Sequence, residues 1–308
     1  MKKVFIDGKE GTTGLQIYDR LQGRPDLCLL TLPEELRKDA AARKEKMNEA
    51  DIVFLCLPDA AAREAVTLAE NPDTKIIDAS TAHRTAEGWA YGFPELSEAH
   101  RRAIAESKRV ANPGCHASGF IALVYPLIAR GLVSPDYPFV CHSVTGYSGG
   151  GKKMIAEYEA ADRDVSLDSP RQYGLTLAHK HLPEMVAVCK LTRKPIFNPI
   201  VADYYCGMCG TVPIFADLMQ KRMTKEVLRE FYAEYYAGHS FVSVAKETGA
   251  YLPSNAFVGT NHMEITVAGN DEQILLCARF DNLGKGASGA AVQNMNLMLG
   301  LEETAYLK

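Results

Sequence analysis

The sequence predicts an α/β protein in which a Rossmann-type dinucleotide-binding domain carries an inserted α+β catalytic domain. The first hundred or so residues alternate short apolar runs with helix-compatible stretches, as parallel strands buried on both faces do. A glycine-rich turn follows the first of these runs, where dinucleotide-binding domains place one. The middle of the chain has longer β-rich stretches, which favour a mixed or antiparallel sheet.

The predicted elements set the domain boundaries. The apolar runs expected to be parallel strands are residues 4–6, 27–32, 52–57 and 75–78, with a further strand end at 110–111. The later β-rich stretches are 140–145, 200–214, 241–245, 263–267 and 274–280, with helices near 120–128, 154–161, 224–236 and 290–301. We therefore expect a dinucleotide-binding domain of residues 1–114 plus 282–308. Residues 115–281 would form the catalytic, substrate and oligomerisation domain.

Composition limits the partners. The chain has 308 residues, of which 47% are hydrophobic and 23% charged, and it has a net charge of -4. It has no block of lysines and arginines, so we expect neither nucleic acid nor a membrane as partner, but a small-molecule substrate. Eight cysteines without framework spacing, and no apolar leader after Met1, favour a reducing cytoplasm.

The turn after the first strand is the candidate cofactor site. Gly8, Gly11 and Gly14 are spaced Gly-x-x-Gly-x-x-Gly, and Thr12 and Thr13 lie between them at a helix start. Glycines let the backbone approach a pyrophosphate, which the N–H groups of the helix N-terminus then bind. We expect all five residues to contact the cofactor.

The residues after the second strand leave the cofactor's type open. Glu34 and Glu35 lie about twenty residues past Gly14, where an acid favours the free ribose hydroxyl of NAD. Arg37 and Lys38 follow at once, as the 2′-phosphate of NADP requires.

A second glycine motif lies near the C-terminus. Gly284, Gly286 and Gly289 match Gly-x-Gly-x-x-Gly, but only 19 residues follow Gly289, too few for a Rossmann domain of its own. We expect this loop and the helix after it to return to the first domain, with Gly284 and Gly286 near the reactive end of the cofactor.

Cys115 is the candidate nucleophile. It follows Asn112-Pro113-Gly114 and precedes an apolar helix, so it would lie in the first turn of that helix. Unpaired N–H groups and the positive end of the helix dipole stabilise a thiolate there.

His179, His181 and Glu184 are the candidate acid–base group. A histidine near a cysteine supplies the proton transfers of acyl chemistry, and the glutamate would fix its tautomer. His-x-His with a glutamate is also a usable metal-ligand set, but nothing nearby completes it, so we expect no metal. Cys206 and Cys209 form a lone Cys-x-x-Cys beside strands, for which we favour a structural role.

Two further segments suggest contacts to anions. Ser80 and Arg84 follow the fourth strand, where Ser80 would face the cofactor and Arg84 would clamp a phosphate or carboxylate. Ser148, Gly149 and Lys152 belong to a glycine, hydroxyl and lysine loop whose N–H groups and cation would also hold an anion.

Taken together, these motifs resemble the N-acetyl-γ-glutamyl-phosphate reductases of arginine biosynthesis, in the shorter of the family's two subtypes. The resemblance spans nearly the whole chain and rests on the order of seven motifs, at residues 8–14, 80–84, 91–96, 112–115, 146–152, 179–184 and 281–296.

The resemblance implies an NADPH-dependent reduction of an acyl phosphate to a semialdehyde, with Cys115 forming a thioester. It implies that His179 or His181 is the acid/base, that Asn112 contacts the substrate and that Asn282 contacts the cofactor. It also implies a homo-oligomer, a homodimer or a homotetramer. Two alternatives remain: aspartate-semialdehyde dehydrogenase, which shares the thiol chemistry, and a dinucleotide-binding sensor without activity.

Overall fold

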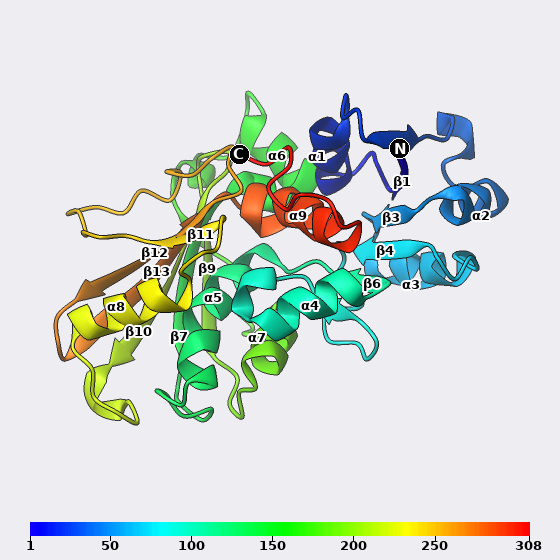
Figure 1. The fold of residues 1–308 in the computed structure, drawn as a ribbon. Helices are drawn as coiled ribbons and strands as arrows, with labels where there is room; N and C mark the ends of the chain where they lie inside the picture. Colours follow the sequence, from blue (N-terminus) through cyan, green and yellow to red (C-terminus); the bar gives the residue numbers. More distant parts are fainter. The chain divides into compact units, whose positions relative to one another are not determined.

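A computed structural model describes residues 1–308, which form two compact units (Figure 1). Unit 1 comprises Met1–Pro113 and Ala287–Lys308, and unit 2 comprises Gly114–Gly286. None of the helices is long and apolar enough to cross a membrane. All eight cysteines are thiols, so no disulfide constrains either unit.

Unit 1 is built on a six-stranded parallel sheet, in the order β2-β1-β3-β4-β6-β5. Its strands are β1 (Lys2–Asp7), β2 (Leu27–Leu30), β3 (Ile52–Leu55), β4 (Lys75–Asp78), β5 (Ala90–Tyr91) and β6 (Arg109–Ala111). The predicted parallel sheet is confirmed. Because β1 pairs with β2 on one side and β3 on the other, the strand order reverses at β1. Ligands of open α/β sheets bind at such a reversal.

Helices cover both faces of this sheet, which explains why the central residues of its strands are apolar on both faces. The helices are α1 (Thr12–Leu21), α2 (Ala40–Glu49), α3 (Asp59–Leu68), α4 (Glu98–Glu106) and α9 (Gly289–Met298). Val4 of β1 packs on one face with Ile17 of α1 and Met295 of α9. Phe5, the next residue of β1, packs on the other face with Met47 of α2.

Unit 2 is built on a seven-stranded mixed sheet, in the order β11-β12-β13-β10-β7-β9-β8. Its strands are β7 (Val140–Gly146), β8 (Arg171–Gln172), β9 (Ile196–Ala202), β10 (Met208–Phe215), β11 (Val242–Val244), β12 (Met263–Gly269) and β13 (Gln273–Phe280). The pairs β11–β12 and β7–β9 are parallel and the others are antiparallel, as predicted for a mixed sheet. The β-rich stretch 200–214 is two strands, separated by a turn at Gly207, whose φ is 115°.

The helices of unit 2 are α5 (Cys115–Ala129), α6 (Gly151–Glu159), α7 (Leu182–Cys189) and α8 (Lys225–Tyr235). Helix α5 packs against β10 and β13, α8 packs against β11 and β12, and α7 packs against α5. Short 3-10 segments lie at η1 (Glu34–Leu36), η2 (Pro94–Leu96), η3 (Tyr147–Gly150), η4 (Val165–Asp168) and η5 (Ala216–Leu218).

Candidate active site

The glycine turn after β1 is as tight as dinucleotide binding requires. A Cβ on Gly8 would lie 2.4 Å from the carbonyl oxygen of Cys56, and a Cβ on Gly14 would lie 2.4 Å from the carbonyl oxygen of Gly8. Gly11 is the N-cap of α1, and Thr12 and Thr13 are its first two residues. Glycines therefore occupy the positions where the backbone of this turn packs most closely, and the backbone N–H groups at the N-terminus of α1 are left open to a ligand.

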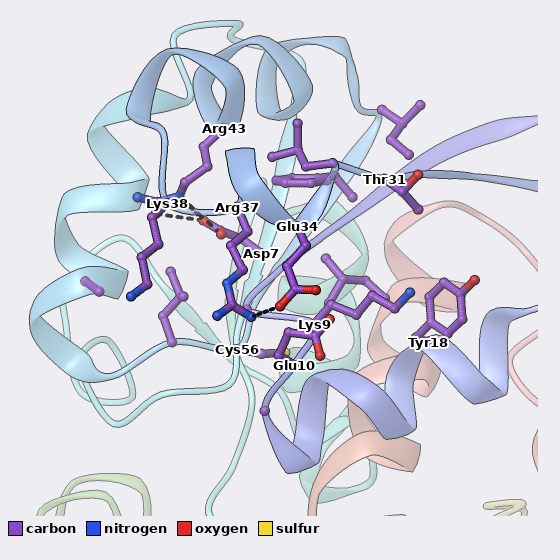
Figure 2. Close-up of a pocket in the computed structure, with 18 of the residues that line it drawn as sticks. Asp7, Lys9, Glu10, Tyr18, Thr31, Glu34, Arg37, Lys38, Arg43 and Cys56 are labelled. Atoms are coloured by element: carbon purple, nitrogen blue, oxygen red, sulfur yellow. Dashed lines mark hydrogen bonds and ion pairs between the residues drawn. The ribbon is translucent and has the colours of Figure 1, made fainter.

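A cavity of about 600 Å³ opens beside this turn (Figure 2). The residues that follow β1, β2 and β3 line it, which places it where the strand order of unit 1 reverses. The last residues of the predicted runs 27–32 and 52–57 lie beyond the strands and line this cavity. Its volume and position suit a nucleotide.

Two cations at the cavity already have partners within the chain. Arg43 donates to both carboxylate oxygens of Asp7, with 2.8 Å between its Nη2 and Asp7 Oδ2, and both side chains are buried. Lys9 Nζ lies 3.4 Å from the centre of the Tyr18 ring, where it forms a cation–π contact. Figure 2 shows both pairs on the cavity wall.

Two further cations remain for a ligand. Arg37 forms only an exposed ion pair with Glu34, with 3.4 Å between Nη1 and Oε1. Lys38 is exposed and forms no ion pair within the chain. Both follow β2, at the strand end that faces the ribose in dinucleotide-binding domains.

Ser80 and Arg84 bond to the strand ends from which they project. Ser80 Oγ donates to the Asp78 carboxylate at 2.7 Å. Arg84 donates from Nε to the carbonyl of Asn112 at 3.0 Å and from Nη2 to the carbonyl of Ala79 at 3.3 Å. Arg84 therefore joins the ends of β4 and β6.

Asn112 is held in turn by the C-terminal segment of unit 1. Its Nδ2 donates to the carbonyl of Ala287 at 3.0 Å, and its Oδ1 accepts from Asn294 Nδ2 at 3.1 Å. Asn112 is buried, so its contacts shape the segment that leads to Cys115.

Cys115 is the first residue of α5, as predicted, and Gly114 is the N-cap. Gly284–Ser288 forms a π-helical turn, and a Cβ on Gly286 would lie 3.0 Å from Cys115 Cβ. At Gly284 a Cβ would lie 2.1 Å from the carbonyl oxygen of Thr260. Both glycines allow close backbone packing, and Gly286 does so beside the cysteine.

His179, His181 and Glu184 lie together at the start of α7. The two histidine rings are 4.8 Å apart between centres. The backbone N–H of His181 donates to Nδ1 of His179 at 3.2 Å, so neutral His179 carries its proton on Nε2. Glu184 is buried, and its Oε2 accepts from the backbone N–H of Gly114 at 3.1 Å. The carboxylate thus contacts the residue directly before Cys115.

Three residues of this cluster were not predicted: His116, Ser143 and Tyr173. His116 Nδ1 lies 2.7 Å from Ser143 Oγ, and Nε2 lies 2.6 Å from the Tyr173 hydroxyl. Burial lowers the pKa of His116 to about 3, with smaller effects from His179, when it is protonated, and from the positive charge of Lys180. Burial and the negative charge of a Cys115 thiolate raise the pKa of Tyr173. His116 could have been predicted as a site residue, because it directly follows Cys115 in the sequence.

The predicted anion loop follows β7. Ser148 is buried and accepts from Asn282 Nδ2 at 3.0 Å, while Asn282 Oδ1 accepts from the N–H of Gly207 at 2.8 Å. Gly149 and Lys152 are exposed. Asn282 therefore anchors this loop within unit 2. The exposed part of the loop offers a bound anion the cation of Lys152 and backbone N–H groups.

The two cysteines of the Cys-x-x-Cys motif lie at the start of β10. Cys206 lies in the turn before β10, and burial raises its pKa to about 11. Cys209 lies on β10, where a hydrogen bond with Cys277 and burial raise its pKa. The structure gathers no group of three or more histidine, cysteine, aspartate or glutamate side chains that could hold a metal ion.

Comparisons with known proteins agree with this geometry. Residues 3–105 match the semialdehyde dehydrogenase NAD binding domain, and residues 115–282 match the semialdehyde dehydrogenase dimerisation domain. The chain is 50% identical to the N-acetyl-gamma-glutamyl-phosphate reductases of Chelativorans sp. (strain BNC1) and Burkholderia lata. The matches cover 96% and 98% of this chain, and 98% of each relative. Aspartate semialdehyde dehydrogenase II from Vibrio cholerae, complexed with ASA, has a TM-score of 0.74 at 15% identity, over 97% of this chain and 98% of that one.

Proposed function

Because the chain belongs to the N-acetyl-γ-glutamyl-phosphate reductase family, we propose that it reduces N-acetyl-γ-glutamyl phosphate to N-acetylglutamate semialdehyde and phosphate, with NADPH, in arginine biosynthesis. The observation that carries the proposal is Cys115, at the N-terminus of α5 within a cluster of histidines. A thiol nucleophile with acid–base partners suits acyl transfer from an acyl phosphate.

Cys115 carries the covalent step. Its thiolate attacks the acyl carbon, the bond to the phosphate oxygen breaks, and a thioester and inorganic phosphate result. NADPH, when bound, would supply the hydride that converts this thioester to a thiohemiacetal. The carbon–sulfur bond of the thiohemiacetal then breaks, the aldehyde is released, and the helix N-terminus stabilises the returning thiolate of Cys115. Backbone N–H groups of the same turn are suited to the oxyanion formed during the attack.

His179 or His181 is the acid/base of this mechanism. Neutral His179 keeps its proton on Nε2, because Nδ1 accepts from the backbone N–H of His181. In this tautomer the Nε2–H of His179 can donate a hydrogen bond or a proton to a substrate oxygen. Glu184 holds the Gly114 amide, and thus the turn that carries Cys115.

The residues around the cavity of unit 1 fit NADP. Gly8 and Gly14 leave room for the pyrophosphate at the N-terminus of α1, with Gly11, Thr12 and Thr13 around it. Arg37 and Lys38 would hold the 2′-phosphate, since the other two cations of the cavity have partners.

This cofactor preference has a direct test. Arg37→Ala should raise KM for NADPH about tenfold or more and leave KM for NADH unchanged, because only the 2′-phosphate contact is lost. Lys9→Ala, at the cation already placed over Tyr18, is the control. An equal change with both cofactors would contradict the role of Arg37.

The remaining proposed contacts follow from the family resemblance. We assign Ser80, Asn282, Gly284 and Gly286 to the cofactor. Arg84, Asn112, Ser148, Gly149 and Lys152 are assigned to the phosphate and carboxylate of the substrate. The match to a dimerisation domain supports oligomers, for which we propose a homodimer or a homotetramer. A cytoplasmic location and the domain limits 1–114 plus 282–308 and 115–281 stay predictions.

The reverse reaction tests the proposed function. Purified protein is given N-acetylglutamate semialdehyde, phosphate and NADP, and the formation of NADPH is followed by absorbance, with aspartate semialdehyde in parallel. We expect phosphate-dependent reduction with the acetylated substrate only. Preference for aspartate semialdehyde would assign the protein to the sister reaction, and no reduction with either would favour a sensor.

A further inference from the structure

The hydrogen-bond chain formed by Ser143, His116 and Tyr173 has a defined direction. Ser143 Oγ contacts His116 Nδ1, and His116 Nε2 contacts the Tyr173 hydroxyl. His116 is neutral, so one ring nitrogen carries a proton and the other accepts one. Which nitrogen is protonated decides where the Tyr173 proton points.

Ser143 settles that question. Its side chain is buried, and His116 Nδ1 is the only hydrogen-bond partner of its hydroxyl. A buried hydroxyl proton without an acceptor costs about 1–3 kcal/mol. Ser143 is buried whereas Tyr173 is half-buried, so the cost is larger at Ser143, and Ser143 donates to Nδ1. The proton of His116 is then on Nε2, and Nε2 donates to the oxygen of Tyr173.

Tyr173 is therefore left with a proton for a further acceptor. Its hydroxyl oxygen accepts from His116, and no residue of the chain accepts its proton. The Tyr173 ring lies 5.9 Å from that of His179, between ring centres, in the cluster around Cys115. An oriented donor without an acceptor in the apo protein is what a site prepared for a reacting oxygen contains.

We propose that the Tyr173 hydroxyl donates a hydrogen bond to the acyl oxygen that becomes negatively charged when Cys115 attacks, and that His116 and Ser143 are positioning residues that hold this donor. The inference rests on the proposed function and adds a substrate-contacting residue to its site. No proton leaves Tyr173 in this role; it donates a hydrogen bond that strengthens as charge develops on the oxygen.

The first variant removes only the hydroxyl. Tyr173→Phe should lower kcat about 100-fold, with KM changed little, because the bond forms mainly in the transition state. Alkylation of Cys115 by iodoacetamide should proceed at the wild-type rate, since the thiol and its helix are unchanged. A matching fall in the alkylation rate would show that Tyr173 acts on the thiol and would overturn the inference.

Variants at His116 separate positioning from packing. His116→Phe should lower kcat as much as Tyr173→Phe, and the double variant should be no slower than either one, because both remove the same bond. His116→Gln should restore part of the rate, since its amide N–H can donate to the Tyr173 oxygen. Equal loss in His116→Phe and His116→Gln would indicate packing alone.

The kinetics are measured in the reverse direction with whichever semialdehyde the wild-type protein oxidises, because the acyl oxygen is common to both. Because the pKa of His116 is about 3, the ratio of wild-type to Tyr173→Phe rates should be constant from about pH 6 to about pH 9. Turnover by the wild type with equal turnover by Tyr173→Phe overturns this inference alone. No turnover by the wild type with either semialdehyde overturns both this inference and the proposed function.

Discussion

Two glycines lie next to Cys115. Gly114 caps its helix and is held by Glu184, and Gly286 approaches the cysteine side chain. The next residue, His116, is buried and neutral. A thiol in this setting has N–H groups on one side and little room on the other, which favours a thiolate with a defined direction of attack.

Cys115→Ser should abolish turnover without changing the fold. A hydroxyl at the helix N-terminus lacks the nucleophilicity of a thiolate, so kcat should fall by about 10³-fold or more. Binding of NADPH, measured by titration, should be unchanged because the cofactor cavity is formed by other residues.

The control for this variant is Cys28→Ser, which changes a half-buried thiol on β2 outside the proposed site. Its activity should match that of the wild type. Substantial turnover by Cys115→Ser would exclude a thioester.

Gly286→Ala should impair catalysis more than stability. The new Cβ would lie 3.0 Å from Cys115 Cβ and 3.2 Å from the carbonyl oxygen of Asp281, so the cysteine has to shift. Small displacements of reacting groups cost about 10²-fold in rate, and we expect kcat to fall by about that factor. Gly249→Ala, whose Cβ would meet nothing closer than 3.6 Å, is the control. An unchanged kcat would mean that the turn can move away from Cys115 at no cost.

Single residues could be predicted from the sequence where their neighbours in the chain define their chemistry. Cys115 at a helix start and glycines in a βα turn were readable because neighbouring residues define their setting. Ser143 and Tyr173 were not, because their partner His116 comes from another element and only the folded chain brings them together.

Elements were predictable where periodicity or apolar runs were strong. The strand at Lys75–Asp78 has the predicted limits, and the apolar run before residue 130 is α5. Helix α7 was not predicted, because Pro183 reads as a break, although a proline is well accommodated in the first turn of a helix. The turn within the stretch 200–214 was not predicted, because the aromatic residues at 204 and 205 are typical of strands.

Helix α2 is joined to β1 by the buried pair of Arg43 and Asp7, which gives a prediction about stability. Arg43→Ala leaves the Asp7 carboxylate buried without its partner, and should lower the free energy of unfolding by about 3–5 kcal/mol. Urea unfolding followed by the fluorescence of Trp89, the single tryptophan, would measure this change in unit 1.

Lys44→Ala, on the same helix, is the matched control, because its pair with Glu70 is exposed and is worth about 0–1 kcal/mol. Adding Asp7→Asn to Arg43→Ala should recover part of the loss, since no charge then remains buried. If Arg43→Ala and Lys44→Ala unfolded at the same urea concentration, the buried pair would not contribute.

In the sequence, unit 2 is inserted between the two segments of unit 1. Unit 1 consists of two segments from opposite ends of the sequence, and unit 2 is a single continuous segment. The terminal helix α9 supplies Val292, Met295 and Met298 to the core that contains Val4 of β1. The first strand of the protein therefore depends on its last helix.

Met295→Ala should destabilise the N-terminal sheet although it lies near the C-terminus. Truncating a fully buried methionine costs about 2–5 kcal/mol, so the Trp89 transition should shift to a lower temperature. Leu297→Ala, half-buried on the same helix, should shift it less. A Trp89 transition that is unchanged by Met295→Ala would show that unit 1 does not need α9.

This arrangement has a consequence for the order of events during synthesis. Domains usually fold from the N-terminus as the ribosome releases them. Here the inserted unit is complete once residue 286 has emerged, whereas the strands made first still lack α9. The nascent chain must therefore carry an unfinished nucleotide-binding sheet until α9 leaves the ribosome, and a premature stop before Gly289 would damage the strands that were translated before unit 2.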